Sequence, residues 1–254
     1  MKIVTCCKVV PNEEEIKVLP SRELSMDEAS YKISQYDLNA LECGKQLAAA
    51  TGGTMTALSI GKNAALESSK IRKDILSRGV DDLSLVIDDT HEFSDSLETA
   101  KAIAEALNVI SGYDLVLCGM GSNDLYSQEV GVQVGALLGL PTLNNVTGIT
   151  ASGDQLLTVE RTLENEVEVL EVTLPAVLSV SSEINVPAVP SMREIMKAGK
   201  KPVNELSVAA DITPSTATTE QLAPQQQERR QEIVEGDNEE AVAALVSFLK
   251  KEGF

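Results

Sequence analysis

The sequence has very few of the residues on which catalytic and metal sites depend. Its 254 residues include one histidine, His91, and no tryptophan. Without a second histidine, histidine-rich metal sites are excluded, and the polar stretch DDTHEFSD around His91 is typical of a surface rather than of a catalytic triad. We therefore expect no metal, and no catalytic residues of the chain's own.

Cysteine is also scarce, and its spacing argues against a cluster. The four cysteines are Cys6, Cys7, Cys43 and Cys118, none of them in a C-x-x-C pair. Adjacent residues of a strand point to opposite faces, so Cys6 and Cys7 are poorly placed to bind one metal ion or cluster together. Buried, reduced thiols are expected, as in a cytoplasmic protein.

Aromatic residues make up 3% of the chain, so Ala, Val, Leu and Ile must fill the core, as they do in parallel sheets covered by helices. No apolar run approaches the ~18 residues of a membrane span. The first residues, MKIVTCCKVVP, predict a strand rather than a signal peptide. We expect a cytoplasmic protein without direct membrane insertion.

Positive charge is in deficit, since 21 Lys and Arg face 39 Asp and Glu, a net charge of −18. Nucleic-acid binding needs a basic surface, so a nucleic-acid partner is not expected. The acidic surface suits solubility or docking onto a basic protein.

What the sequence does contain is a fourfold alternation of strand and helix. Residues 2–10, 54–60, 83–87 and 113–118 are predicted strands; residues 37–50, 64–77, 96–111 and 128–138 are predicted helices. Alternation of this kind predicts an α/β fold, with an open, mostly parallel twisted sheet and helices on both faces.

The pattern changes after Pro141. Residues 146–180 carry turn signals and dense Val, Thr and Leu, which predicts two or three antiparallel strands added to the sheet. A proline-punctuated loop and a short helical segment follow. We expect an α/β domain over residues 1–203, an extended linker arm over 204–236, rich in Thr, Gln and Pro, and a C-terminal helix over 237–254. This helix would dock on a partner subunit or on the chain's own core.

A ligand is expected beyond the carboxyl ends of the strands, at residues 6–11, 59–61 and 119–131. In the last stretch Gly119 and Gly121 follow a strand, and a helix starts near Gln128. Glycines and a helix start fit a phosphate. The stretch is neither a G-x-G-x-x-G fingerprint nor a P-loop, and a tight turn without a ligand is the alternative.

Five segments together resemble the electron transfer flavoprotein beta subunit family, nearest to its FixA-like bacterial branch. They are KIVTCCKVVPNEEEI, KISQYDLNALE, RKDILSRGVDDL, DLVLCGMGSNDLYSQEVGVQVGALLGLP, and the stretch from VERTLENEVEVLEV to MREIMKAGKKPV, which spans 159–203. The last is the most specific. The sequence departs from the family pattern at Asn165, a good turn residue, and at Ser127 and Val130, where threonine is common.

The resemblance implies an adenine nucleotide alpha hydrolase-like fold and a heterodimer with an alpha subunit, which holds most of the FAD. It also implies AMP or a second FAD in the beta subunit's own pocket. Carried over by position, this pocket comprises Cys7, Lys8, Asn39, Ser59, Gly119, Ser122, Asn123, Asp124, Ser127, Gln128, Val130 and Gly131.

The resemblance further implies a partner-recognition loop over residues 187–201, with Met192 as its apolar anchor and Ile195 and Lys197 beside it. Electrons would pass from an acyl-CoA dehydrogenase-like donor to an acceptor similar to electron transfer flavoprotein–quinone oxidoreductase. Two alternatives are a stand-alone AMP- or ATP-binding sensor and an enzyme acting on a nucleotide. The lack of a P-loop and of a second histidine disfavours the enzyme.

Overall fold

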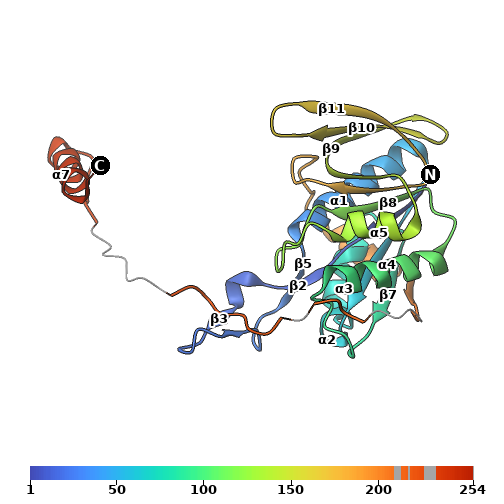
Figure 1. Cartoon of the computed structure of the whole chain (residues 1–254), viewed down its shortest axis with the longest axis horizontal. Coiled ribbons are helices and arrows are strands. Elements are labelled where there is room, and N and C mark those ends of the chain that lie inside the picture. Colours follow the sequence, from blue (N-terminus) through green and yellow to red (C-terminus); the bar gives the residue numbers. More distant parts are fainter. Residues whose placement is uncertain (209–212, 217, 226–232, 254) are drawn as a thin grey trace.

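One nine-stranded sheet forms the centre of the computed structural model, which describes residues 1–208, 213–216, 218–225 and 233–253 (Figure 1). The strand order is β11-β10-β9-β12-β8-β1-β6-β7-β13. In that order the strands are Val167–Thr173, Leu156–Thr162, Thr142–Gly153, Ala176–Val180, Leu115–Gly119, Lys2–Cys6, Thr54–Gly61, Asp82–Ile87 and Val203–Glu205. Strands β9 to β11 pair antiparallel, and all other neighbours pair parallel.

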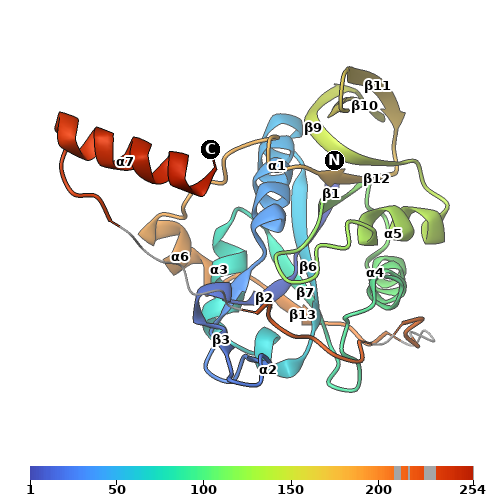
Figure 2. The ribbon, with the colours of Figure 1, turned by 60° about the vertical axis from the view of Figure 1, so that its left-hand side comes forward.

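Helices cover both faces of this sheet (Figure 2). The helix α1 (Gln35–Thr51) packs on one face, against β1 and β8. The helices α4 (Ser96–Ile110) and α5 (Val130–Leu138) pack side by side on the other. Shorter helices are α2 (Asn63–Leu66), α3 (Ser69–Ser77) and α6 (Met192–Ala198), the last packed on α3. The predicted α/β fold is confirmed.

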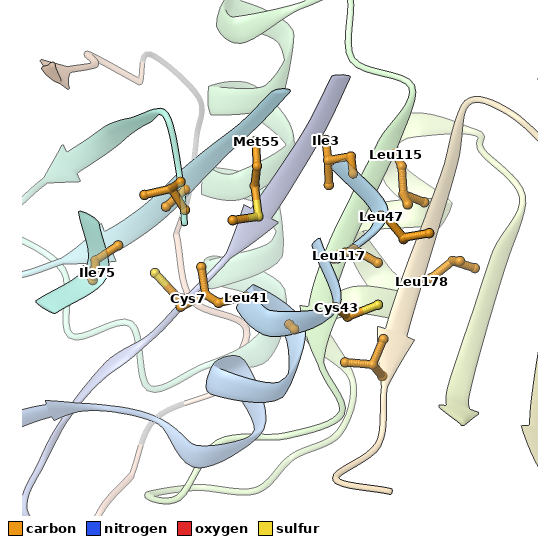
Figure 3. Packing of buried hydrophobic residues seen from close by; sticks show 14 of the residues in the cluster. Ile3, Cys7, Leu41, Cys43, Leu47, Met55, Ile75, Leu115, Leu117 and Leu178 are labelled. Carbon is orange, nitrogen blue, oxygen red and sulfur yellow. The ribbon is translucent and has the colours of Figure 1, made fainter. Parts of the chain in front are cut away.

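The core follows the alternation of side chains along the buried strands. In β1, Ile3 belongs to the cluster beneath α1, and the next residue, Val4, belongs to the cluster beneath α4 and α5. In β8, Leu115 and Leu117 face α1, whereas Val116 faces the opposite side. Figure 3 shows the first cluster, in which aliphatic side chains and thiols pack together. Both faces are therefore filled largely without aromatic rings, as the composition predicted.

Several predicted boundaries were wrong near the N-terminus. The first strand ends at Cys6, and Val9–Pro11 forms a separate strand, β2, which pairs with β5 (Tyr31–Ile33). The stretch predicted as irregular also contains a 3-10 turn (Glu13–Glu15) and the small pair β3 (Lys17–Val18) and β4 (Leu24–Ser25). Residues 9–33 thus form an N-terminal excursion held by local antiparallel pairs. Strands this short and polar have no clear pattern in the sequence, so they were not predicted.

Helix and strand boundaries differ elsewhere as well. The helix α1 starts after Ser34 rather than at Asp37, and the helix predicted over 64–77 is divided into α2 and α3. The antiparallel extension is confirmed, but β9 already begins at Thr142, and β12 lies within the parallel part of the sheet between β8 and β9. The strand β13 begins at Val203, pairs with β7 and continues to Glu205, inside the stretch predicted as a linker.

The C-terminal part of the chain begins as an arm that contacts the domain. Part of the predicted linker, residues 209–212, 217 and 226–232, lies outside the described residues. Ser215 and Thr216 donate hydrogen bonds to Asp95, and Ala223 exchanges hydrogen bonds with Arg22.

The helix α7 (Glu239–Glu252) follows, and Asn238, not Asp237, caps its start. None of the residues of α7 is buried, and Figure 1 shows this helix apart from the sheet. A search of the described helices finds none with the length and hydropathy of a bilayer span.

Candidate functional site

A cavity of about 90 Å³ lies where β1, β6 and β8 end and α4 and α5 approach. Its walls are apolar on the α4 side, with Leu58, Phe93 and Ile103, and polar around the loop that follows β8. A second cavity, of about 440 Å³, adjoins it and shares Lys8, Ile60 and Phe93 in its walls. The sheet thus places a hollow at the carboxyl ends of its parallel strands, where α/β proteins bind ligands.

The loop after β8 depends on two glycines. A Cβ atom on Gly119 would lie 2.5 Å from Asp37 Oδ1, and one on Gly121 would lie 2.6 Å from the Tyr126 ring. The Tyr126 ring in turn packs on Tyr36, with 5.4 Å between ring centroids. Because neither position has space for a side chain, the glycines let the loop pack against α1 and pass the cavity as bare backbone.

The start of α5 forms the next part of the wall, through Gln128, Glu129 and Val130. No side chain caps this helix start, so its first N–H groups lack the partner that a capping residue would supply. Such a terminus carries partial positive charge and suits a phosphate. Gly131 and Gly135 serve packing instead, since a Cβ there would lie within 2.0 Å of Ser179 or Thr142.

Lys8 is the only Lys or Arg among the residues that line the smaller cavity. Its ammonium group lies 2.6 Å from Asp124 Oδ2. Burial by itself raises the pKa of the Asp124 carboxyl, but the charge and hydrogen bond of Lys8, together with hydrogen bonds from Ser122 and Leu125, outweigh this and lower the pKa. The Asp124 carboxylate therefore stays charged, and an incoming phosphate would compete with it for Lys8.

Asp37 is a site residue that the sequence analysis missed. Its carboxylate is buried and accepts hydrogen bonds from Lys8 N at 2.7 Å and Gly119 N at 3.1 Å. It thereby joins the ends of β1 and β8. Burial raises the pKa of Asp37 to about 7, although these two amides and the Lys8 charge oppose the rise. Because acids are common in the first turn of a helix, the sequence pattern indicated a helix start at Asp37 and not a residue that joins two strand ends.

The structure brings together only part of the predicted nucleotide pocket. Six of the predicted residues line the smaller cavity: Cys7, Lys8, Gly119, Ser122, Gln128 and Val130. Asn123 and Asp124 line the larger cavity beside it. Asn39, Ser59, Ser127 and Gly131 line neither of the two.

Three of the predicted side chains are engaged in holding the fold. Asn39 donates to Asn185 O at 2.8 Å and fixes the loop after β12. Ser59 donates to Cys7 O at 2.7 Å, which ties β6 to the end of β1. Asn123 accepts from Gln35 N at 2.7 Å and so holds the loop after β8 on the start of α1.

Lining residues from the β7–α4 connection and from α4 were also missed. Phe93 of the connection and Thr99 and Ile103 of α4 line the smaller cavity, whereas a ligand was expected only at the ends of the first, second and fourth predicted strands. The connection carries no glycine, so nothing in its sequence indicates that it contributes to the site. Its contribution follows from the sheet order, which places β7 beside β6.

The predicted recognition loop is an exposed surface. Met192 is 74% exposed, and Val186, Val189 and Met196 are exposed nearby. Ile195 and Lys197 lie on the same short helix, α6, which a capping box of Ser191 and Glu194 begins. Exposed apolar side chains grouped in this way are typical of interaction surfaces, and whether this loop is one stays a prediction.

The described residues hold no group of three or more His, Cys, Asp or Glu that could bind a metal. The fold and the cavity define an α/β protein with a candidate anion site at the ends of its parallel strands. A family model for the electron transfer flavoprotein domain matches residues 23–211. The chain therefore belongs to the electron transfer flavoprotein family, and the match is consistent with its beta subunit.

Proposed function

We propose that this chain is the beta subunit of a heterodimeric electron transfer flavoprotein of the FixA-like branch. It would bind an adenine nucleotide, AMP or a second FAD, in the cavity at the strand ends, and cover part of an FAD held mainly by the alpha subunit. The main support for this proposal is that the uncapped start of α5 and Lys8 line the same cavity, in a chain of this family.

The residues around the cavity fit a nucleotide phosphate. The phosphate would lie at the N–H groups that begin α5, with Ser122 as a hydrogen-bond donor and Lys8 as the cation. FAD, when bound, supplies the electron-transfer chemistry. The chain's own residues would hold and orient the nucleotide and exclude water, and we assign none of them a catalytic role.

Two exposed surfaces support a role in an assembly. The apolar residues of α7, Val242, Leu245, Val246 and Leu249, are all exposed and suit docking on the alpha subunit. Met192, Ile195 and Lys197 would contact an acyl-CoA dehydrogenase-like donor, since a flexible methionine adapts to a partner surface. The acceptor would be an oxidoreductase that passes electrons to quinone, and the assembly would be cytoplasmic.

Co-purification tests the proposal. The chain is expressed with and without an alpha subunit, and the purified material is analysed for flavin and for released nucleotides. We expect a yellow heterodimer that carries FAD and one further adenine nucleotide per beta chain. A colourless monomer that ignores the alpha subunit but binds AMP or ATP would instead support the stand-alone sensor.

A matched pair of variants locates the docking surface. Leu245→Ser places a polar group on the apolar face of α7 and is expected to weaken the heterodimer, because that face then loses apolar contact area. Leu19→Ser, at an exposed leucine of the N-terminal excursion, serves as the control. Equal heterodimer yields from both variants would contradict docking through α7.

A further inference from the structure

Phe93 occupies a position between the two cavities that no other aromatic residue shares. Its ring lines both the cavity of about 90 Å³ and the cavity of about 440 Å³. Ile60 and Lys8 are the other shared residues, but Ile60 belongs to a strand inside the sheet and Lys8 is paired with Asp124. Phe93 lies on the β7–α4 connection and is the one apolar shared residue outside the sheet, so its ring sets the width of the passage between the two cavities.

The smaller cavity does not hold a whole nucleotide. Pockets for compact organic ligands have volumes of roughly 300 to 1,000 Å³. A mononucleotide with its phosphate at the start of α5 must therefore extend into the larger cavity, and a dinucleotide must place its second half there. Both paths lead past Phe93, because Phe93 lies in the common wall.

The backbone holds Phe93 in an uncommon conformation. Its φ is 51°, in the left-handed region, where a bulky aromatic residue is rare. Strained residues of this kind persist where the surrounding structure fixes them, and they are frequent at ligand sites. The ring packs in a small cluster with Ala102 and Ile60 and belongs to neither of the two large core clusters. Packing of the main core therefore does not account for its position.

The loop around Phe93 is braced on both sides. Before it, Asp88 accepts a hydrogen bond from Thr90 N at 2.7 Å, and its Oδ2 lies 2.8 Å from His91 Nδ1. After it, Asp95 accepts from Glu98 N at 2.8 Å and caps α4. These contacts fix the backbone on either side, and the His91 ring packs on the Phe93 ring with 5.9 Å between centroids, which holds the ring in the passage.

We infer that Phe93 is a specificity-determining residue that limits the size of the nucleotide the chain binds. This inference rests on the proposed nucleotide site. With the ring in the passage, a mononucleotide needs only the near part of the larger cavity, whereas a dinucleotide has to displace the ring. The chain therefore favours AMP over a second FAD, and shortening Phe93 shifts this preference toward FAD.

The experiment compares dissociation constants of the full chain, freed of nucleotide, for two probes, AMP and FAD. Phe93→Ala is expected to lower the ratio of the FAD constant to the AMP constant at least about tenfold, the scale on which pocket size discriminates ligands. Val109→Ala, at an exposed position of α4 outside the walls of both cavities, is the control and leaves the ratio unchanged. Phe93→Leu, which keeps an aliphatic side chain, gives a smaller shift and decides the matter if Phe93→Ala does not fold.

Two outcomes overturn the inference, and they can be told apart. If the wild-type chain binds AMP but folded Phe93 variants keep its FAD-to-AMP ratio, Phe93 does not set ligand size, while the proposed site stands. If the wild-type chain binds neither probe, the proposed site itself fails, and the inference fails with it.

Discussion

The two parts of the single sheet differ in how they are covered. The strands β1, β8 and β12 are buried along nearly their whole length, because helices cover both faces. The strand β10 has two buried residues among half-buried and exposed ones, and β11, an edge strand, alternates between exposed and half-buried or buried residues. The cavities lie at the ends of parallel strands, and none of the residues that line them comes from β9 to β11.

This difference follows from connectivity. Parallel strands need crossover helices, so their carboxyl ends open into loops that diverge toward opposite faces and leave a hollow. Antiparallel strands connect through short turns, as β10 and β11 do, and leave no such hollow. Side chains in the parallel part should therefore be more sensitive to substitution than those in β11.

The largest difference in the free energy of unfolding is expected between two truncations, one in each part of the sheet. Leu117→Ala in β8 removes a fully buried side chain and should reduce the free energy of unfolding by about 2 to 5 kcal/mol. Val169→Ala in β11 removes a side chain that is 63% exposed and should change it by less than about 0.5 kcal/mol. Urea unfolding monitored by circular dichroism measures both. Similar losses would contradict the comparison.

The parallel part also contains a buried carboxyl group, that of Asp37, whose titration should make the stability of the chain depend on pH. The pKa of Asp37 is about 7 in the folded chain, against an ordinary value of 3.8. Between these pH values the folded state holds a proton that the unfolded state releases, so stability falls as pH rises from about 4 to 7 and is unaffected by this group above that.

Asp37→Asn cannot titrate and should lose this dependence. The free energy of unfolding of the wild type minus that of the variant should fall by about 1.4 kcal/mol for each pH unit between about pH 4 and pH 7. Loss of one hydrogen-bond acceptor in the variant adds a constant offset, so the slope is the diagnostic quantity. Parallel pH curves for the two proteins would contradict a raised pKa.

A third comparison uses glycines. Gly135→Ala would place a Cβ 1.8 Å from Thr142 Oγ1, beneath α5, and should cost about 1 to 3 kcal/mol through overpacking. Gly153→Ala, at the last residue of β9, would place a Cβ 3.7 Å from its nearest atom and should be nearly neutral. Thermal melts of both variants provide the measurement. A neutral Gly135→Ala would show that α5 can move away from the sheet.

The smallest effect is expected for the ion pair between β10 and β11. Arg161 Nε lies 2.9 Å from Glu168 Oε2, but the geometry is not that of a hydrogen bond. Glu168→Gln should therefore cost less than about 1 kcal/mol, as is usual for partly exposed pairs. Denaturant unfolding at low and high salt measures it. A loss of several kcal/mol would indicate that the antiparallel part is held as tightly as the parallel part.

The alternation of strand and helix was predictable because each buried strand and each amphipathic helix has its own periodicity. The loop at Gly119 and Gly121 was predictable as well, since it combines a strand end with a helix start. Asp37 was not, because its function depends on Lys8 and Gly119, 29 and 82 residues away in sequence. Phe93 was missed for the same reason, since only the sheet order brings its loop to the cavity.

The proposed function requires that the parallel strand ends hold a nucleotide phosphate beside Lys8. Chromatography of nucleotide released from the purified heterodimer tests this directly, in the wild type, in Lys8→Ala, and in Lys70→Ala, a control at an exposed lysine of α3 outside both cavities. We predict that Lys8→Ala loses the second adenine nucleotide while Lys70→Ala retains it. Wild-type protein without that nucleotide, or with equal amounts in all three, would contradict the claim.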